Sequence, residues 1–351
     1  MLPKEIVDNA RRGAFSYFYA GGANRKNEEV LNDNNCLRLQ SYAMEKSNIM
    51  KRIANGYKTF IDSGAYSAMT KGIDINIDDY IDFINTYEDS IILACQFDVI
   101  PDAKTDPETS ARKTWENFLY MRERVNNPSK LLYVWHSAED IKWLEQALNL
   151  EPRIEYMALG GLVGKSVKQR DEAMKKCFDT IKASKNPDIC VHAFGMSNRK
   201  LLKKYPFTSA DSTSWLQPVR FGNIHALDFK SILISERQFD NPKHYLNLPK
   251  EIREAVDIEV QSLGSNVQFL IDNPGERTCY QTLYWNNYFS KFEQDEDNPV
   301  VKMIKKELGQ QVKENESKQS VEANVVSELS SSEHHVEVKE TVEDEEEFDL
   351  W

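Results

Sequence analysis

Short apolar runs rich in β-forming residues recur along the chain, and each is followed by a charged, amphipathic segment of helical length. The runs cover residues 15–20, 58–62, 91–98, 131–136, 156–161, 189–195, 207–211 and 226–235. Strands that alternate with helices pair in parallel, because each helix returns the chain to the start of the next strand. Eight such units predict an α/β fold, a (β/α)8 TIM barrel, rather than an open sheet. Segments 140–148 and 168–183 have the apolar spacing of helices that cover such a barrel.

The alternation of strand-like and helix-like segments stops after residue 235. We therefore predict three domains. Residues 1–240 form the barrel, residues 241–309 form a helical cap subdomain, and residues 310–351 form a disordered acidic tail. The aromatic-dense segment 279–292 is the strongest helix of the cap. Aromatic residues at helical spacing form a hydrophobic core more often than a surface for base stacking.

Most of the net negative charge of the chain lies in its C-terminal tail. From Gln310 onward, 13 acidic residues face three lysines, whereas the preceding 309 residues carry 43 acidic and 41 basic residues. The tail ends in EDEEEFDLW, which predicts either a solubilising segment or a peptide that docks on a protein partner through Phe348, Leu350 and Trp351. Residues 1–309 are therefore nearly neutral, so the net negative charge of the whole chain does not exclude a nucleic-acid substrate.

Other features narrow the class of protein. No apolar run reaches the roughly 18 residues that a membrane span needs, and the N-terminus lacks the apolar core of a signal peptide, so we expect a cytoplasmic protein. The five cysteines are scattered and have no CxxC spacing, which argues against disulfides and a cysteine-rich zinc site. Cys190 and His192 are neighbours on one strand, but two ligands do not make a metal site.

Polar residues close several of the apolar runs. They are Asp62, Asp98, His136, Gly160, Gly161, His192, Gly195 and Asp211. The active site of a TIM barrel lies at the C-terminal ends of its strands, so these residues converge there. Singly, each aspartate could cap a helix and each glycine could make a turn. Three strand-terminal carboxylates together favour glycosidic chemistry, with one as nucleophile and another moving a proton.

The neighbouring residues favour an N-glycoside over an O-glycoside. Paired glycines let a flat ring approach the backbone, and Tyr66 could stack on that ring. The motifs DSGAYS, FDVI, ALGGLV, HAFGM and SADSTSW then occur in the order and spacing of the tRNA-guanine transglycosylase superfamily. Between residues 15 and 222 the chain resembles that superfamily, and its compact form is closest to phage-type enzymes that insert a 7-deazaguanine such as preQ0 into DNA.

The resemblance implies roles for particular residues. Asp211 would be the nucleophile that displaces guanine from C1′ and holds the sugar covalently, and Asp62 would be the general acid/base. The base would be bound by Asp98, Tyr66, His136, Gly160, Gly161 and Gly195. Asp211 must then remain ionised while Asp62 exchanges its proton, which requires two different environments.

Several residues differ from the motifs of the family, and these differences concern the cofactor and the inserted base. The tRNA enzymes carry a CxCxxC zinc motif after the nucleophile, which is missing here, so we expect no zinc and no other cofactor. Ala65, Ser67 and Ile100 stand where the family has Gly, Gln and Cys, and His136 stands where it has Gln. These changes leave open which deazaguanine is inserted.

Binding of a polymer requires positive charge near the pocket. Candidates are Arg220, Arg199, Lys200 and Lys165, although such residues can equally be the solvated faces of helices. The predicted function is exchange of guanine for a free deazaguanine base in DNA. Alternatives are the same exchange in tRNA, a nucleoside or glycoside hydrolase, and a non-catalytic barrel that binds nucleic acid. The resemblance also allows a homodimer.

Overall fold

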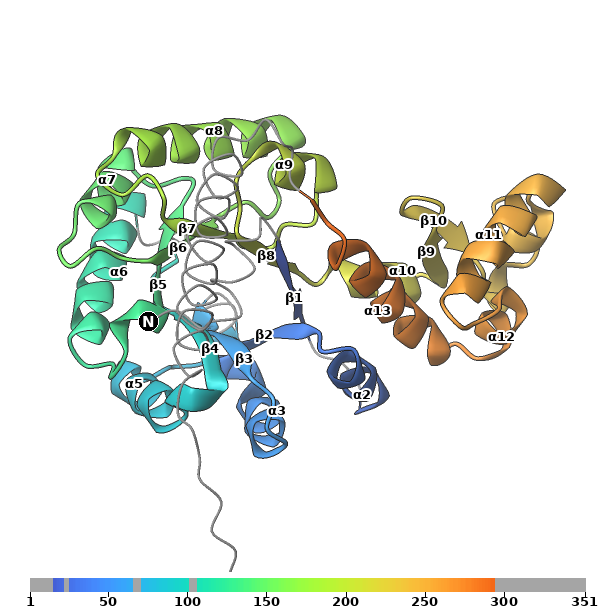
Figure 1. Ribbon diagram of the computed structural model, residues 1–351, viewed down its shortest axis with the longest axis horizontal. Helices are drawn as coiled ribbons and strands as arrows, with labels where there is room; N and C mark the ends of the chain where they lie inside the picture. Colours follow the sequence, from blue (N-terminus) through green and yellow to red (C-terminus); the bar gives the residue numbers. More distant parts are fainter. Residues whose placement is uncertain (1–14, 22–24, 66–70, 101–105, 294–351) are drawn as a thin grey trace, which may run out of the picture. The chain divides into compact units, whose positions relative to one another are not determined.

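Eight parallel strands form a closed barrel in the computed structural model, which describes residues 15–21, 25–65, 71–100 and 106–293 (Figure 1). The strands are β1 (Ser16–Ala20), β2 (Leu37–Ser41), β3 (Thr59–Asp62), β4 (Ile91–Cys95), β5 (Leu131–His136), β6 (Tyr156–Gly160), β7 (Cys190–Ala193) and β8 (Ser209–Ser212). β8 pairs with β1, which closes the barrel. The prediction of a (β/α)8 barrel is thus confirmed at the level of architecture.

Helices surround the barrel and continue beyond it. They are α2 (Arg25–Asp33), α3 (Tyr42–Ala54), α5 (Ile77–Thr86), α6 (Pro107–Arg122), α7 (Ile141–Leu148), α8 (Val167–Ala183), α9 (Arg199–Lys204), α10 (Gln217–Arg220), α11 (Lys250–Ser262), α12 (Val267–Asp272) and α13 (Glu276–Phe289). Caps define several of their starts: in α8, Ser166 and Gln169 form a reciprocal capping box. The two helices predicted at 140–148 and 168–183 are α7 and α8.

Side chains on each strand alternate between the barrel interior and the helix layer. A compact inner cluster includes Phe18, Leu39, Phe60, Val134 and Ala158, all buried. The intervening positions belong to a larger cluster shared with the helices. Because the period is two, the residue two positions beyond an inner-cluster residue also points inward, at the C-terminal mouth of the barrel.

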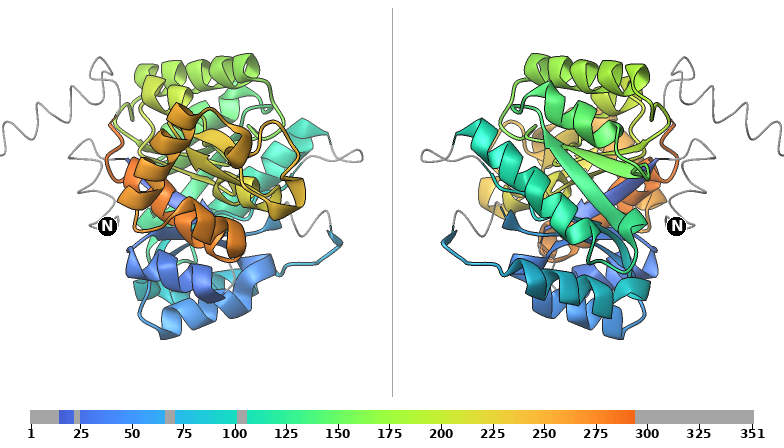
Figure 2. Two further views of the ribbon diagram at one scale, coloured as in Figure 1. Left: turned by 90° about the vertical axis from the view of Figure 1, so that its right-hand side faces the viewer. Right: turned by 90° about the vertical axis from the view of Figure 1, so that its left-hand side faces the viewer.

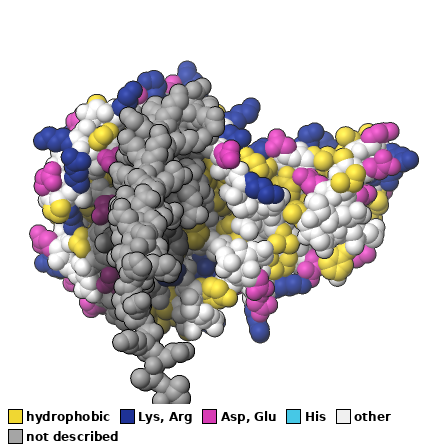
Figure 3. All heavy atoms as spheres, viewed as in Figure 1, with side chains coloured by type: hydrophobic (Ala, Val, Ile, Leu, Met, Phe, Trp, Pro, Cys, Tyr) yellow, Lys and Arg dark blue, Asp and Glu magenta, His cyan; other side chains and the backbone are white. Residues whose placement is uncertain are grey.

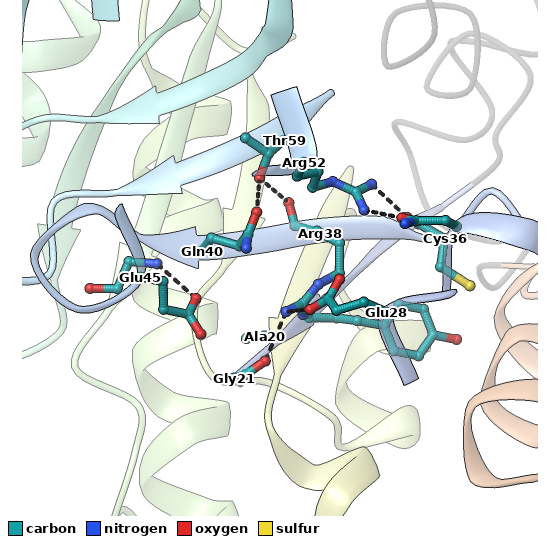
Figure 4. Close-up of polar contacts among 12 residues, drawn as sticks. Ala20, Gly21, Glu28, Cys36, Arg38, Gln40, Glu45, Arg52 and Thr59 are labelled. Atoms are coloured by element: carbon teal, nitrogen blue, oxygen red, sulfur yellow. Dashed lines mark hydrogen bonds and ion pairs between the residues drawn. The ribbon is translucent and has the colours of Figure 1, made fainter. Parts of the chain in front are cut away.

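The strand β2 was missing from the sequence prediction. Its outward positions hold Arg38 and Gln40, both fully buried, so only the inward-facing residues of the strand are apolar. Arg38 pairs with Glu28 of α2 at 2.8 Å and donates to two backbone carbonyls at the end of β1, and Gln40 accepts from Thr59 at 3.0 Å (Figure 4). A buried charge is tolerated when it is paired in this way, but it hides the strand from an apolar-run search.

The prediction of a barrel strand at residues 226–235 is wrong. The chain instead forms a two-stranded antiparallel hairpin of β9 (Asn223–Ala226) and β10 (Lys230–Leu233), which is not part of the barrel. With β2 included, β8 already pairs with β1, so no position is left for another strand. The nucleophile candidate Asp211 therefore lies on the last strand of the barrel.

Three helices, α11, α12 and α13, follow residue 248, and the last of them packs against β1. Tyr17 of β1 stacks on Phe289 with ring centroids 4.0 Å apart, and Phe15 lies 4.9 Å from Phe292. In Figure 2 (left), α13 lies between α2 and the helices α8 and α9, so it completes the helix layer over β1. Its aromatic residues are core, as the spacing predicted; each such ring pair adds about 1 kcal/mol beyond area burial. Residues 294–351, including the predicted tail, lie outside the described residues.

Candidate active site

Polar residues from several strands meet at the C-terminal mouth of the barrel. Asp62, His136, Gly160 and Asp211 each follow an inward-facing residue of the barrel interior by two positions. They therefore point inward at the level where the strands end. Asp98 lies three residues after β4 and joins the group through hydrogen bonds described below. The structure thus brings together the three carboxylates predicted from the sequence.

Asp211 lies at one end of a buried hydrogen-bond chain. Its Oδ1 accepts from the backbone N–H of Gly195 at 3.0 Å and lies 3.2 Å from Nε2 of His192. Nδ1 of His192 lies 2.7 Å from Oγ of Ser209, which in turn lies 2.7 Å from the hydroxyl of Tyr156. A carboxylate only accepts, so Nε2 of His192 carries the proton and Ser209 donates to Nδ1. Oδ1 of Asp211 therefore accepts two hydrogen bonds.

Asp98 belongs to a second chain, which is charged. Its Oδ1 accepts from Ser63 at 3.1 Å, and its Oδ2 lies 3.2 Å from Nε2 of His136. Nδ1 of His136 lies 2.9 Å from Glu139, whose other oxygen accepts from the backbone N–H of His136 at 3.1 Å. Burial works against a charged ring, but hydrogen bonds to Asp98 and Glu139 raise the pKa of His136 to about 10. The ring is an imidazolium held between two carboxylates.

Asp62 has the environment of a group that exchanges a proton. Burial raises the pKa of Asp62 to about 7, and the charges of Asp98 and Asp211 contribute to the rise. A hydrogen bond of 3.1 Å from the backbone N–H of Gly64 opposes it. Asp62 and Asp211 therefore lie at the same end of the barrel but differ in their surroundings: burial and two neighbouring charges favour the neutral form of Asp62, whereas Asp211 accepts two hydrogen bonds.

Three glycines at the mouth of the barrel each have a steric or conformational reason to lack a side chain. A side chain at Gly160 would place its Cβ 2.7 Å from Cδ2 of His136, so this histidine fills the space that a larger residue would need. Gly161 has a φ of +68°, a conformation that other residues rarely adopt, and its carbonyl accepts from Ser137 at 2.8 Å. Gly195 has a φ of +61° and directs its N–H to Asp211.

The remaining predicted site residues are not part of this cluster. Tyr66 lies outside the described residues. Lys165 is half-buried, and Arg220 and Lys200 are exposed. Arg199 pairs with Asp228 and lies over Phe229 at 4.3 Å, away from the three carboxylates. On the described part of the face seen in Figure 3, basic and acidic side chains mix around the edge rather than form one basic patch.

Several residues of the site carried no assigned role in the sequence. Glu139, Ser63, Ser209 and Tyr156 were not singled out, and His192 was noted only as a strand-terminal residue. For Ser209 the reason is register: it pairs with His192 across β7 and β8, which a single sequence does not reveal. Glu139 had a local signal, since a carboxylate three residues after a histidine in a turn can reach the ring.

Two further findings concern the described residues as a set. In the described part of the chain, no group of three or more His, Cys, Asp or Glu side chains is arranged to hold a metal ion. Across the same residues, none of the helices is both long and apolar enough for a transmembrane segment.

Comparisons with known proteins add no assignment. No protein-family model matches the chain, and no curated protein matches it. The chemistry of the barrel mouth must therefore be inferred from its geometry and from the sequence motifs.

Proposed function

We propose that this chain is a transglycosylase that replaces guanine in DNA with a 7-deazaguanine through a covalent sugar–aspartate intermediate. The observation that carries the proposal is the contrast between two carboxylates in one pocket. Asp211 receives two hydrogen-bond donors, whereas burial and two neighbouring charges raise the pKa of Asp62 to about 7. A nucleophile that stays ionised and an acid/base that titrates near neutrality are the pair that base exchange requires.

The proposed reaction has two displacements at C1′ of the sugar. The Asp211 carboxylate forms a bond to C1′ while the bond from C1′ to N9 of guanine breaks, and the departing base takes up the proton of the Asp62 carboxylic acid, which leaves Asp62 as a carboxylate. The incoming base then loses a proton to the Asp62 carboxylate and forms the new C1′–N bond, which releases Asp211. Each displacement leaves the enzyme ready for the reverse proton transfer, as a group with a pKa near neutrality allows.

In the proposal, the hydrogen-bonded group of Asp98, His136 and Glu139 recognises the base. In the proposal, Asp98 accepts from the N–H groups on the edge of the guanine, while Ser63 and the imidazolium of His136 hold that carboxylate in place. Gly161, which is exposed, would let the ring approach the backbone, whereas His136 occupies the space beside Gly160. The exchanged base must leave a duplex stack before it can enter such a pocket, which favours single-stranded DNA.

The test is incorporation of radiolabelled guanine, and of deazaguanine bases, into matched single-stranded DNA, duplex DNA and tRNA. Asp211→Ala is compared with the intact protein and with Asp188→Ala, an exposed aspartate before β7 at the opposite end of the barrel. We expect incorporation into DNA by the intact protein and by Asp188→Ala, and a loss of at least about a thousandfold in Asp211→Ala. A sugar-linked adduct should also be trapped on a denaturing gel and be absent in Asp211→Ala.

The outcomes separate the parts of the proposal. Incorporation into tRNA alone would keep the mechanism and replace the polymer. Exchange that persists in Asp211→Ala would remove the nucleophile. Release of free base without any incorporation, by correctly folded protein, would point to a hydrolase instead.

A further inference from the structure

A cavity lies beside the barrel mouth. Its volume is about 370 Å³, and it is bounded by the loops after β7 and β8 and by the β9–β10 hairpin. Ser197 and Ser214 form one wall and are hydrogen-bonded to each other at 3.1 Å. Ser214 also lies 2.7 Å from Ser212, the residue that follows Asp211. Because Ser214 is only three positions after Asp211, the cavity begins within roughly 10 Å of the proposed nucleophile.

One lining residue, His225 of the hairpin, has a tautomer fixed by its hydrogen bonds. His225 lines the cavity, and its Nδ1 accepts from Trp285 at 3.1 Å and from Gln281 at 2.9 Å. Two donors at Nδ1 require that the proton of the neutral ring is on Nε2. Burial, together with the charge of Arg199, lowers the pKa of His225 to about 4. The ring therefore remains a neutral donor over the physiological pH range.

The backbone at the tip of the hairpin has an unusual conformation, which positions Phe229 against Arg199. Leu227, Asp228 and Phe229 have φ values of 49°, 59° and 64°, which residues other than glycine rarely adopt. The strain is held by hydrogen bonds from backbone N–H groups of the tip, one to Glu259 and one to Tyr284. This places Phe229 under the guanidinium of Arg199.

Arg199 and Phe221 give the cavity a cation and an aromatic face. Arg199 lies over Phe229 and over Tyr288, at 4.3 and 5.4 Å from the ring centroids, and its carboxylate partner Asp228 is 79% exposed. An ion pair so exposed to water is weak, so an anionic ligand can replace the carboxylate. Phe221 lines the same cavity and is 69% exposed, unlike most large aromatic side chains of the protein.

We propose that this cavity binds a nucleotide adjacent to the exchanged one in a single-stranded nucleic acid, with its base on Phe221 and its phosphate at Arg199 and His225. A flat apolar ring, a guanidinium and neutral N–H and hydroxyl donors are together the groups that a nucleotide engages. The inference rests on the proposed function for its ligand class, since a polymer that enters the barrel mouth must continue past it.

The experiment measures binding without requiring catalysis. A fluorescent single-stranded DNA with one central guanine is titrated with protein at fixed salt, and each neighbouring nucleotide is replaced in turn by an abasic site. The intact protein, Phe221→Ala and the control Phe269→Ala are compared by fluorescence anisotropy. Phe269 is a 44% exposed phenylalanine on α12 that does not line the cavity, so both variants remove a partly exposed ring.

We expect one abasic position to weaken binding to the intact protein about tenfold, as loss of one stacked base does. Phe221→Ala should weaken binding to the unmodified strand by a similar factor and should show no further loss at that abasic position. Phe269→Ala should behave as the intact protein. Additive losses, or a Phe221→Ala protein that binds as tightly as the intact one, would overturn the inference.

The same variants separate this inference from the proposed function. If Phe221→Ala and the abasic site are coupled but no polymer is modified by the intact protein, the nucleotide site stands and base exchange fails. If base exchange occurs and Phe221→Ala leaves both KM and oligonucleotide affinity unchanged, base exchange stands and the nucleotide site fails. Unchanged thermal unfolding of Phe221→Ala shows that the fold is intact.

Discussion

The two sides of the barrel mouth each hold a buried histidine against a strand-terminal aspartate, and they differ in the second partner of the ring. On the β4–β5 side, His136 lies between Asp98 and Glu139, two carboxylates. On the β7–β8 side, His192 lies between Asp211 and the hydroxyl of Ser209. A carboxylate partner favours a second proton on the ring, whereas a hydroxyl can donate to the unprotonated nitrogen.

Under the proposed function, the difference would let aspartates at one end of the barrel perform two different tasks. The charged side locks Asp98 to a fixed cation, which suits a group that reads a substrate and does not react. The other side gives Asp211 a directed donor from a ring that needs only one proton, so one lone pair of the carboxylate is oriented and the rest of the group can reach a substrate. Asp62 responds to both sides, since the charges of Asp98 and Asp211 both raise its pKa.

The largest expected effect is on the charged side. Glu139→Gln removes one of the two carboxylates around His136 and should lower the free energy of unfolding at pH 6 by about 3 kcal/mol, as removal of one partner from a buried pair does. The folded-state pKa of His136 is raised to about 10, so its stabilisation is complete below about pH 6.5 and is lost as pH rises through 10. Glu139→Gln should therefore flatten the fall in stability between pH 6.5 and 10.

Urea unfolding at pH 6 and at pH 10 measures both effects. Glu145→Gln, at an exposed position on α7, is the matched control and should change neither. Equal pH dependence in Glu139→Gln and the intact protein would show that His136 is not held as an imidazolium, and the contrast between the two sides would collapse.

The next effect concerns the nucleophile. His192→Asn removes the Nε2 donor to Asp211 and should lower kcat for base exchange about a hundredfold, the usual loss for one donor to a reacting charge. The amide nitrogen of glutamine reaches the position of Nε2, so His192→Gln should retain more of the rate. Steady-state kinetics should show the change in kcat with little change in KM. Equal losses in both variants would indicate that the ring only fills space.

The third effect is a loss of folded-state stability caused by ionisation of Asp62. Its pKa is raised from about 4 to about 7, so ionisation destabilises the folded protein progressively as pH rises from 4 through 7. Asp62→Asn should be about 2 kcal/mol more stable than the intact protein at pH 8, discounted because the side chain is only partly buried, and close to it at pH 4. Urea unfolding at the two pH values tests this. Greater stability of the intact protein at pH 8 would mean that Asp62 is not perturbed.

The carboxylates at the mouth of the barrel could be located from the sequence better than their hydrogen-bond partners. Asp62 and Asp211 could be found because they end apolar runs, and a run end in a (β/α)8 barrel points to the site. Leu37–Ser41 was missed because Arg38 and Gln40 occupy its outward positions. The hairpin was read as one strand because its turn, Leu227 to Phe229, contains none of the glycine or asparagine that such positive φ values favour.

Partners across strands depend on register, which a single sequence does not specify. The bond between His192 and Ser209 exists because these residues pair across β7 and β8. A slip of one residue would put Ser209 in the helix layer and Ala210 beside the ring. Closure of the barrel determines that register, so the hydrogen-bond chain behind Asp211 is a property of the whole fold.

The smallest expected effect is at the end of that chain. Tyr156→Phe removes the hydroxyl that lies 2.7 Å from Ser209 and should lower the free energy of unfolding by about 1 kcal/mol, the usual net value of one hydrogen bond. It should change kcat by less than about threefold, because Ser209 keeps its own proton for His192. Ser209→Ala is the comparison, since it removes that proton. A Tyr156→Phe loss in kcat as large as that of His192→Asn would mean that the hydroxyls and the ring act as one unit. The two sides of the mouth would then differ in the length of the chain behind the ring as well as in the ring's second partner.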